Sequence, residues 1–123
     1  MTRANRDKEF QAVWDAARAA GLAAGASVNP NPMVVEDKQS GAQWFVSEGV
    51  CGFAWITVHP ANCPFSNWLK KNRLGKTSYS GGVTIWISDF NQSMARKEQC
   101  AFAMAKMFKE KLGVNCYANS RMD

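Results

Sequence analysis

The sequence lacks any uninterrupted apolar run that approaches the roughly 20 residues needed to cross a bilayer. Its first ten residues, MTRANRDKEF, carry charge but no apolar segment of the kind found in secretory signals. We therefore expect a cytoplasmic protein with no membrane partner. The chain also lacks a Gly-rich phosphate-binding fingerprint and paired carboxylates at motif spacing, and it has a single histidine. These absences predict that the protein is not an enzyme.

The cysteines are few and widely spaced, with no C-x2-C pair of the kind found in zinc knuckles. His59 and Cys63 have H-x3-C spacing, and Cys51 lies upstream, but a zinc site would need Cys100 or Cys116 to converge by folding. A nucleophilic pair of Cys63 and His59 would lack a third member. We expect four free thiols and a chain that folds without metal, disulfide or cofactor.

Charge is distributed unevenly along the chain, whose formal net charge is +5. Residues 1–62 contain five basic and six acidic residues, whereas residues 63–123 contain ten basic and four acidic ones. This asymmetry favours an anionic partner for the second half. A few net charges also serve solubility alone, so the charge by itself leaves both interpretations open.

The length of 123 residues and an apolar content of 46% predict one globular domain, 1–123. Apolar residues at helical spacing predict an N-terminal helix within 1–26, which could pack as an arm on a main unit formed by 41–123. The Pro/Asn stretch between them, 27–33, reads as a loop.

The remaining patterns give the order α-β-β-β-α-β-β-α-β, which predicts an α+β fold with a mostly antiparallel sheet. A proline near its start and a glycine at its end predict a short middle helix within 62–75. A long helix is predicted within 93–113, with Ser93 as its N-cap and Gly113 after its last turn. We expect this helix to pack through one apolar face, formed by Met94, Ala101, Met104, Ala105, Phe108 and Leu112.

Two predicted strands, GFAWITVH and VTIWIS, alternate in a way that separates two kinds of face. One face is aliphatic: Ala54, Ile56, Val58, Val83, Ile85 and Ile87. The other mixes aromatic, hydroxyl and imidazole groups: Phe53, Trp55, Thr57, His59, Thr84, Trp86 and Ser88. We expect the aliphatic face to pack against the helices and the mixed face to be partly wet. The alternative is a second core layer, covered by the N-terminal helix or by another subunit.

An open aromatic face with a basic rim is typical of proteins that bind single-stranded nucleic acid, because bases stack on the rings and cations follow the phosphates. We predict stacking on Phe53, Trp55 and Trp86. The predicted rim comprises Tyr79, Lys70, Lys71, Arg73, Lys76, Arg96 and Lys97. The same surface would also suit a protein–protein module, such as an inhibitor of a host or defence protein, or a homodimer that pairs through the sheet.

Two resemblances bear on these hypotheses. The run ARKEQCAFAMAKMFKEKL resembles the final helix of double-stranded-RNA-binding domains over about twenty residues, although a further strand follows it in this chain. From about Gly49 to Asp123, the runs GFAWITVHPANCPFSNWLKKN, YSGGVTIWISDFNQSMARKE and YANSRMD resemble a family of small proteins that recurs in tailed-phage genomes. The second resemblance implies an accessory protein that acts in the cytoplasm of an infected host cell, and it brings no activity or site residues with it.

Overall fold

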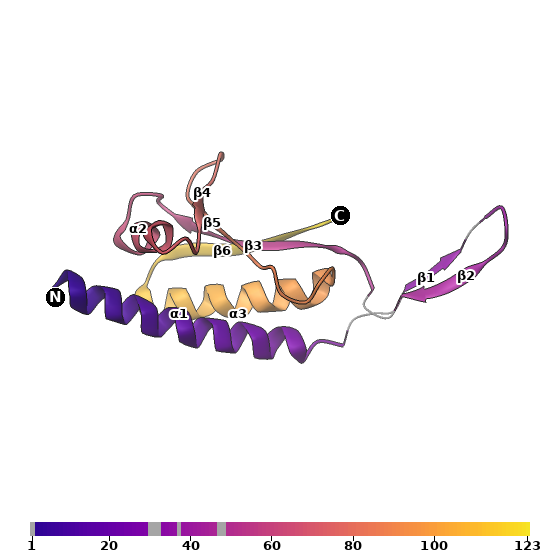
Figure 1. The fold of residues 1–123 in the computed structure, drawn as a ribbon, viewed down its shortest axis with the longest axis horizontal. Coiled ribbons are helices and arrows are strands. Elements are labelled where there is room, and N and C mark those ends of the chain that lie inside the picture. Colours follow the sequence, from indigo (N-terminus) through magenta and orange to yellow (C-terminus); the bar gives the residue numbers. More distant parts are fainter. Residues whose placement is uncertain (1, 30–32, 37, 47–48) are drawn as a thin grey trace.

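The computed structural model describes residues 2–29, 33–36, 38–46 and 49–123, and its helices and strands follow the order expected from the sequence. They are α1 (Arg3–Ala26), β1 (Met33–Glu36), β2 (Gln43–Val46), β3 (Gly52–His59), α2 (Pro64–Lys71), β4 (Lys76–Thr77), β5 (Val83–Trp86), α3 (Met94–Leu112) and β6 (Asn115–Met122) (Figure 1). Among the described residues, no helix combines the length and the apolar content needed to span a bilayer.

The main sheet has four antiparallel strands in the order β4-β5-β3-β6. At its centre, β3 pairs with β5, where Trp55 faces Trp86, and with β6, where Phe53 faces Arg121. The segments β3-α2-β4 and β5-α3-β6 each join two parallel strands that have a third strand between them. This is a split β-α-β-β-α-β arrangement. The α+β prediction is thereby confirmed.

Two further elements are added to this arrangement. Helix α1 packs along α3 on the helical side of the sheet (Figure 1). Strands β1 and β2 form a separate two-stranded antiparallel sheet, which Figure 1 shows beyond the ends of α1 and β3. Of the Pro/Asn stretch predicted as a loop, residues 30–32 lie outside the described residues.

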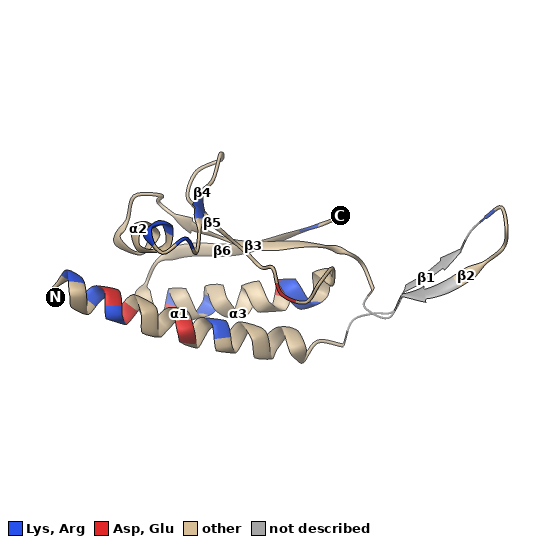
Figure 2. Ribbon diagram, in the orientation of Figure 1, with Lys and Arg blue, Asp and Glu red and all other residues tan. Residues whose placement is uncertain are grey.

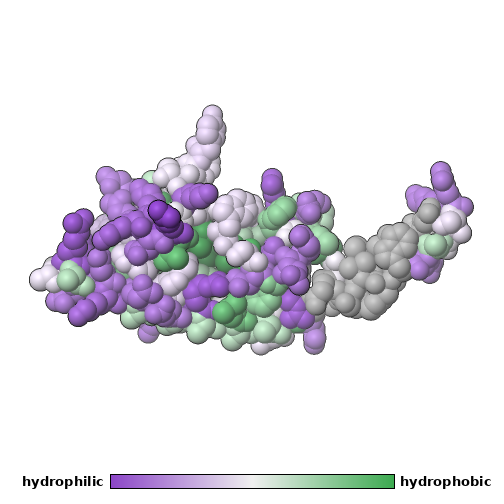
Figure 3. All heavy atoms as spheres, viewed as in Figure 1, coloured by the Kyte–Doolittle hydropathy of each residue, from purple (hydrophilic) through white to green (hydrophobic). Residues whose placement is uncertain are grey.

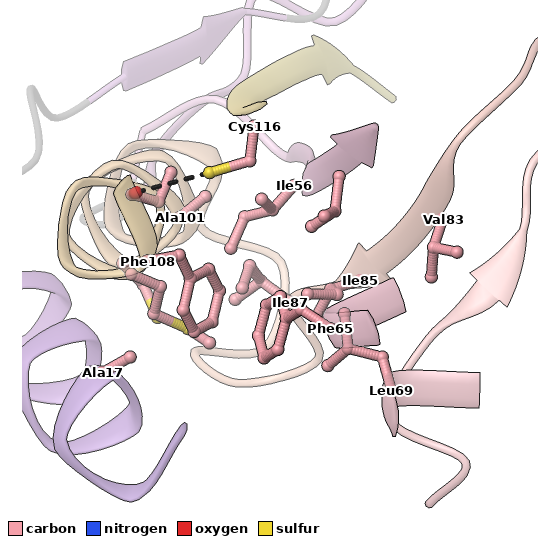
Figure 4. Packing of buried hydrophobic residues seen from close by; sticks show 14 of the residues in the cluster. Ala17, Ile56, Phe65, Leu69, Val83, Ile85, Ile87, Ala101, Phe108 and Cys116 are labelled. Atoms are coloured by element: carbon pink, nitrogen blue, oxygen red, sulfur yellow. Dashed lines mark hydrogen bonds between the residues drawn. The ribbon is translucent and has the colours of Figure 1, made fainter. Parts of the chain in front are cut away.

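The core forms between the aliphatic face of the sheet and the helices, as predicted. Figure 4 shows these side chains converging from β3, β5, β6 and all three helices, with Phe108 among them. The Phe108 ring is fully buried, with its centroid 6.0 Å from that of Trp14 on α1 and 5.1 Å from that of Phe65 on α2. The fully or nearly fully buried aliphatic residues of β3 and β5 are Ala54, Ile56, Val58, Val83 and Ile85. Ile87 is also buried, but it follows the end of β5 at Trp86, two residues before the end of the predicted strand.

Glycine allows α1 to approach α3 closely. A Cβ atom added to Gly21 would lie 2.7 Å from Cγ of Met104, closer than real Cβ contacts come. One turn later, a Cβ atom on Gly25 would meet the ring of Phe90. These two glycines, which weaken the helix as a sequence pattern, are therefore needed for packing.

The predicted ends of α3 are also confirmed, and two glycines form the turn between β4 and β5. The Ser93 hydroxyl accepts a hydrogen bond from the Arg96 amide at 3.4 Å, and Gly113 adopts the left-handed conformation with φ 65°. Between β4 and β5, Gly81 and Gly82 have φ values of 103° and 74°. Residues that carry a side chain rarely adopt this backbone conformation, which explains why both positions are glycine.

Candidate functional site

Three aromatic residues gather on the outer face of the sheet, opposite the helices. Trp55 and Trp86 are directly paired on the two central strands, with ring centroids 5.2 Å apart. Phe53 meets Trp86 edge to face at 6.5 Å. Trp86 is 54% exposed, and Phe53 and Trp55 are half-buried. Because α1 packs on α3 instead of covering this face, the alternative in which α1 makes it a second core layer is wrong.

Strand β6 adds residues to this outer face that the sequence analysis did not assign. Since Cys116 is buried in the core and side chains alternate, Tyr117, Asn119 and Arg121 point outward. The Tyr117 hydroxyl lies 3.1 Å from Nε2 of His59, and the two rings are stacked at 5.6 Å. The alternation after Cys116 is the sequence signal that assigns these residues to the outer face.

The end of the aromatic group nearest Phe53 is positively charged. Arg121 lies opposite Phe53 in the strand register, with its guanidinium carbon 5.5 Å from the ring centroid. The ammonium of Lys97, on α3, lies 5.8 Å from the same centroid. Both distances fall within the range of cation–π contacts. Lys97 is only 6% exposed, so its side chain is buried almost to its end.

The other predicted basic residues lie on α2, β4 and the connections around them. Lys76 is exposed and lies opposite Thr84, which places it on the same face as the aromatic residues. Lys70 donates a hydrogen bond to the Ala61 carbonyl at 2.8 Å, and Lys71 is exposed, 3.9 Å from the Asp7 carboxylate. Figure 2 shows basic residues, and no acidic ones, on α2 and β4. Two further predicted residues are fully or largely exposed: Arg73 after α2, and Tyr79 in the turn between β4 and β5.

Arg96 has a structural role that the sequence analysis missed. Its Nη1 atom donates hydrogen bonds at 3.0 Å to the carbonyls of Gly25 and Ala26, the last residues of α1. A cation at this end of a helix is stabilising because the carbonyls there carry partial negative charge. The structure therefore shows Arg96 fastening α1 to α3, which differs from the predicted role as an open phosphate contact.

The thiols and the histidine do not come together. Cys63 caps α2, with its sulfur accepting from the Ser66 amide, while His59 contacts Tyr117. Burial raises the pKa of the Cys100 and Cys116 thiols above their ordinary value. Within the part of the chain that the structure describes, no group of three or more histidine, cysteine, aspartate or glutamate residues is placed to hold a metal ion.

Hydrophilic and apolar residues occupy different regions of the surface in the view of Figure 3. Figure 3 shows hydrophilic residues over α2 and the N-terminal part of α1, with apolar residues gathered toward the middle of the molecule.

Comparison with known protein families, with characterised proteins and with solved structures finds no match for this chain. Any assignment of function therefore depends on the geometry of the chain's own residues.

Proposed function

We propose that the protein binds single-stranded nucleic acid on the outer face of its sheet. The observation that carries this proposal is the adjacent pair Trp55 and Trp86 on the two central strands, with Trp86 54% exposed. A large aromatic ring at the centre of an antiparallel sheet offers a flat surface for a base. Four-stranded sheets of RNA-binding domains use aromatic residues on their strands in the same way, to stack two or three bases.

The charge of the same face supports this proposal. Its strand residues include Lys76 and Arg121, and none of the described strand residues on this face is acidic. Phosphate groups on either side of a stacked base would thus meet neutral or positive groups. The resemblance to tailed-phage proteins suggests an infected cell as the setting.

The test is a titration of labelled oligothymidine and oligouridine with the wild-type protein and with Trp86→Ala. Loss of one stacked base should weaken binding by about 1–3 kcal/mol. Because Trp86 is 54% exposed, the free energy of unfolding should fall by less than the roughly 3–5 kcal/mol typical of truncating a buried aromatic side chain. Phe102→Ala is the matched control, since Phe102 is 53% exposed but lies on α3, away from this face.

The outcomes separate this proposal from a protein partner. A stable Trp86→Ala protein with unchanged affinity for both oligonucleotides would contradict the proposal. If the wild type binds neither oligonucleotide and Trp86→Ala instead converts a dimer to a monomer, the face pairs two copies of this chain. Binding to nucleic acid should also weaken steeply with salt, whereas an apolar interface should not.

A further inference from the structure

We propose that Lys97 and Arg121 form a phosphate-binding subsite at the Phe53 end of the outer sheet face. This inference rests on the proposed binding of single-stranded nucleic acid and assigns one part of that site. The phosphate would be that of the phosphodiester next to the base stacked on Trp86. The proposal depends on two residues that belong to different elements, α3 and β6.

The first observation is the environment of the Lys97 ammonium. Lys97 is 94% buried, and among the described residues no carboxylate pairs with its Nζ and no acceptor hydrogen-bonds it. No buried side-chain nitrogen or oxygen among the described residues lacks a hydrogen-bond partner, so the small exposed part of Lys97 includes its ammonium. A lysine commonly packs its apolar stem while its charged end stays in water. Lys97 therefore presents an accessible cation beside the Phe53 ring, 5.8 Å from its centroid, with no counter-charge on the protein.

The second observation is the route by which this ammonium meets the outer face. Helix α3 packs on the opposite side of the sheet from Phe53. On the β6 side the pairing of β3 continues past Phe53 to Gly52. On the β5 side the pairing ends where the Ile87 amide donates to the Ala54 carbonyl, after which the chain leaves the sheet. We infer that Lys97 passes the sheet at this opening and presents its ammonium beside the ring.

The third observation is that Arg121 brings a second cation to the same ring. Its guanidinium lies 5.5 Å from the Phe53 centroid, and Arg121 is exposed. Two like charges beside one ring repel each other, and no carboxylate among the described residues pairs with either. An anion bound between them would relieve this repulsion. The guanidinium suits a phosphate because it donates two parallel hydrogen bonds to neighbouring oxygens.

The experiment measures how the affinity for labelled oligothymidine depends on sodium chloride concentration. For single strands, log K decreases with log salt concentration, and this slope becomes less steep by about 0.7 for each phosphate contact that is lost. A lower slope here means a less steep one. Because both cations serve one phosphate, we expect the double variant Lys97→Met/Arg121→Met to lose that amount of slope and each single variant to lose part of it. Lys106→Met, which removes an exposed α3 lysine paired with Glu110, should leave it unchanged. Trp86→Ala should weaken binding without changing the slope, because it removes a base contact.

Thermal stability without oligonucleotide supplies an independent readout for Lys97. If the ammonium serves the ligand, Lys97→Met should melt close to the temperature of the wild type, because methionine keeps an apolar stem of similar length and the charge has no counter-charge on the protein to lose. A marked fall in melting temperature would show instead that Lys97 is structural. In that case Arg121→Met still tests the subsite, because the Arg121 side chain is exposed and its replacement should not disturb the core.

The failure of this inference can be told from the failure of the proposed function. If Trp86→Ala weakens binding while Lys97→Met and Arg121→Met both keep the wild-type slope, the sheet face binds nucleic acid but the subsite is wrong. If the wild type does not bind oligothymidine, both the function and the subsite are overturned. A reduced slope for both methionine variants, with Lys106→Met unchanged, would establish the subsite.

Discussion

Phe108→Ala should be the most destabilising single truncation in α3. The Phe108 side chain is fully buried between Trp14 and Phe65, and replacing a buried phenylalanine by alanine typically costs about 3–5 kcal/mol. The better helix propensity of alanine returns only about 0.5 kcal/mol. For a chain of 123 residues, an unfolding entropy of about 2.1 cal/mol/K per residue turns each kcal/mol into roughly 4 °C. The melting temperature should therefore fall by about 10–18 °C.

Phe102→Ala provides a control with the same chemistry on the same helix. Phe102 is 53% exposed, so the two substitutions share the propensity gain and differ mainly in burial. Thermal and urea unfolding followed by circular dichroism would measure both. A Phe108→Ala protein that melts within 3 °C of the wild type, or a Phe102→Ala protein that loses as much stability, would show that the buried face of α3 has been assigned wrongly.

Two further predictions concern other parts of the molecule. Arg96→Met should lower the free energy of unfolding by about 1–3 kcal/mol, because it removes charge-assisted hydrogen bonds to the last carbonyls of α1. It should leave the salt slope of oligonucleotide binding unchanged. A lowered slope would show that Arg96 contacts phosphate after all. Burial raises the pKa of the Cys100 and Cys116 thiols, so the unfolded chain loses these protons first and stability should fall as the pH rises above about 8.5. Urea unfolding at pH 7.5 and 9.5 should show that the free energy of unfolding falls less between these pH values in Cys100→Ala/Cys116→Ala than in the wild type. An equal fall in both proteins would show that the buried thiols do not cause the loss.

Most of the fold could be predicted because periodicity and end signals agree. The alternation around Ile56 and Ile85 fixed which sides of two strands face the helices, and burial follows that assignment. Ser93 and Gly113 marked the ends of α3. The strand order could not be derived, since nothing local in the sequence states that β6 lies beside β3 and not beside β4. That choice depends on the packing of helices against the whole sheet.

The candidate site could be predicted only in part, for a related reason. Trp55, Trp86 and Phe53 share a face because of their own strands, which is local information. Arg121 joins them only through the pairing of β3 with β6. Lys97 lies three residues after Met94 and four before Ala101, on the face of α3 that helical spacing assigns to the core. Its burial therefore had a signal in the spacing, but its charge placed it in the predicted rim. Arg96 was assigned to phosphate because a basic residue near a helix start looks the same whether it contacts a ligand or another helix.

The central position of β3 has a consequence for how the chain folds. Both of its neighbours come from far along the chain: Ile56 pairs with Ile85 on one side and with Ala118 on the other. Closing such long loops precedes the gain from pairing, so a domain of this kind should fold more slowly than a helical bundle of similar stability. Until both neighbours arrive, an aliphatic strand has two open edges, which is the kind of intermediate that aggregates. Production at lower temperature should therefore increase the soluble yield, most of all for variants that weaken β6.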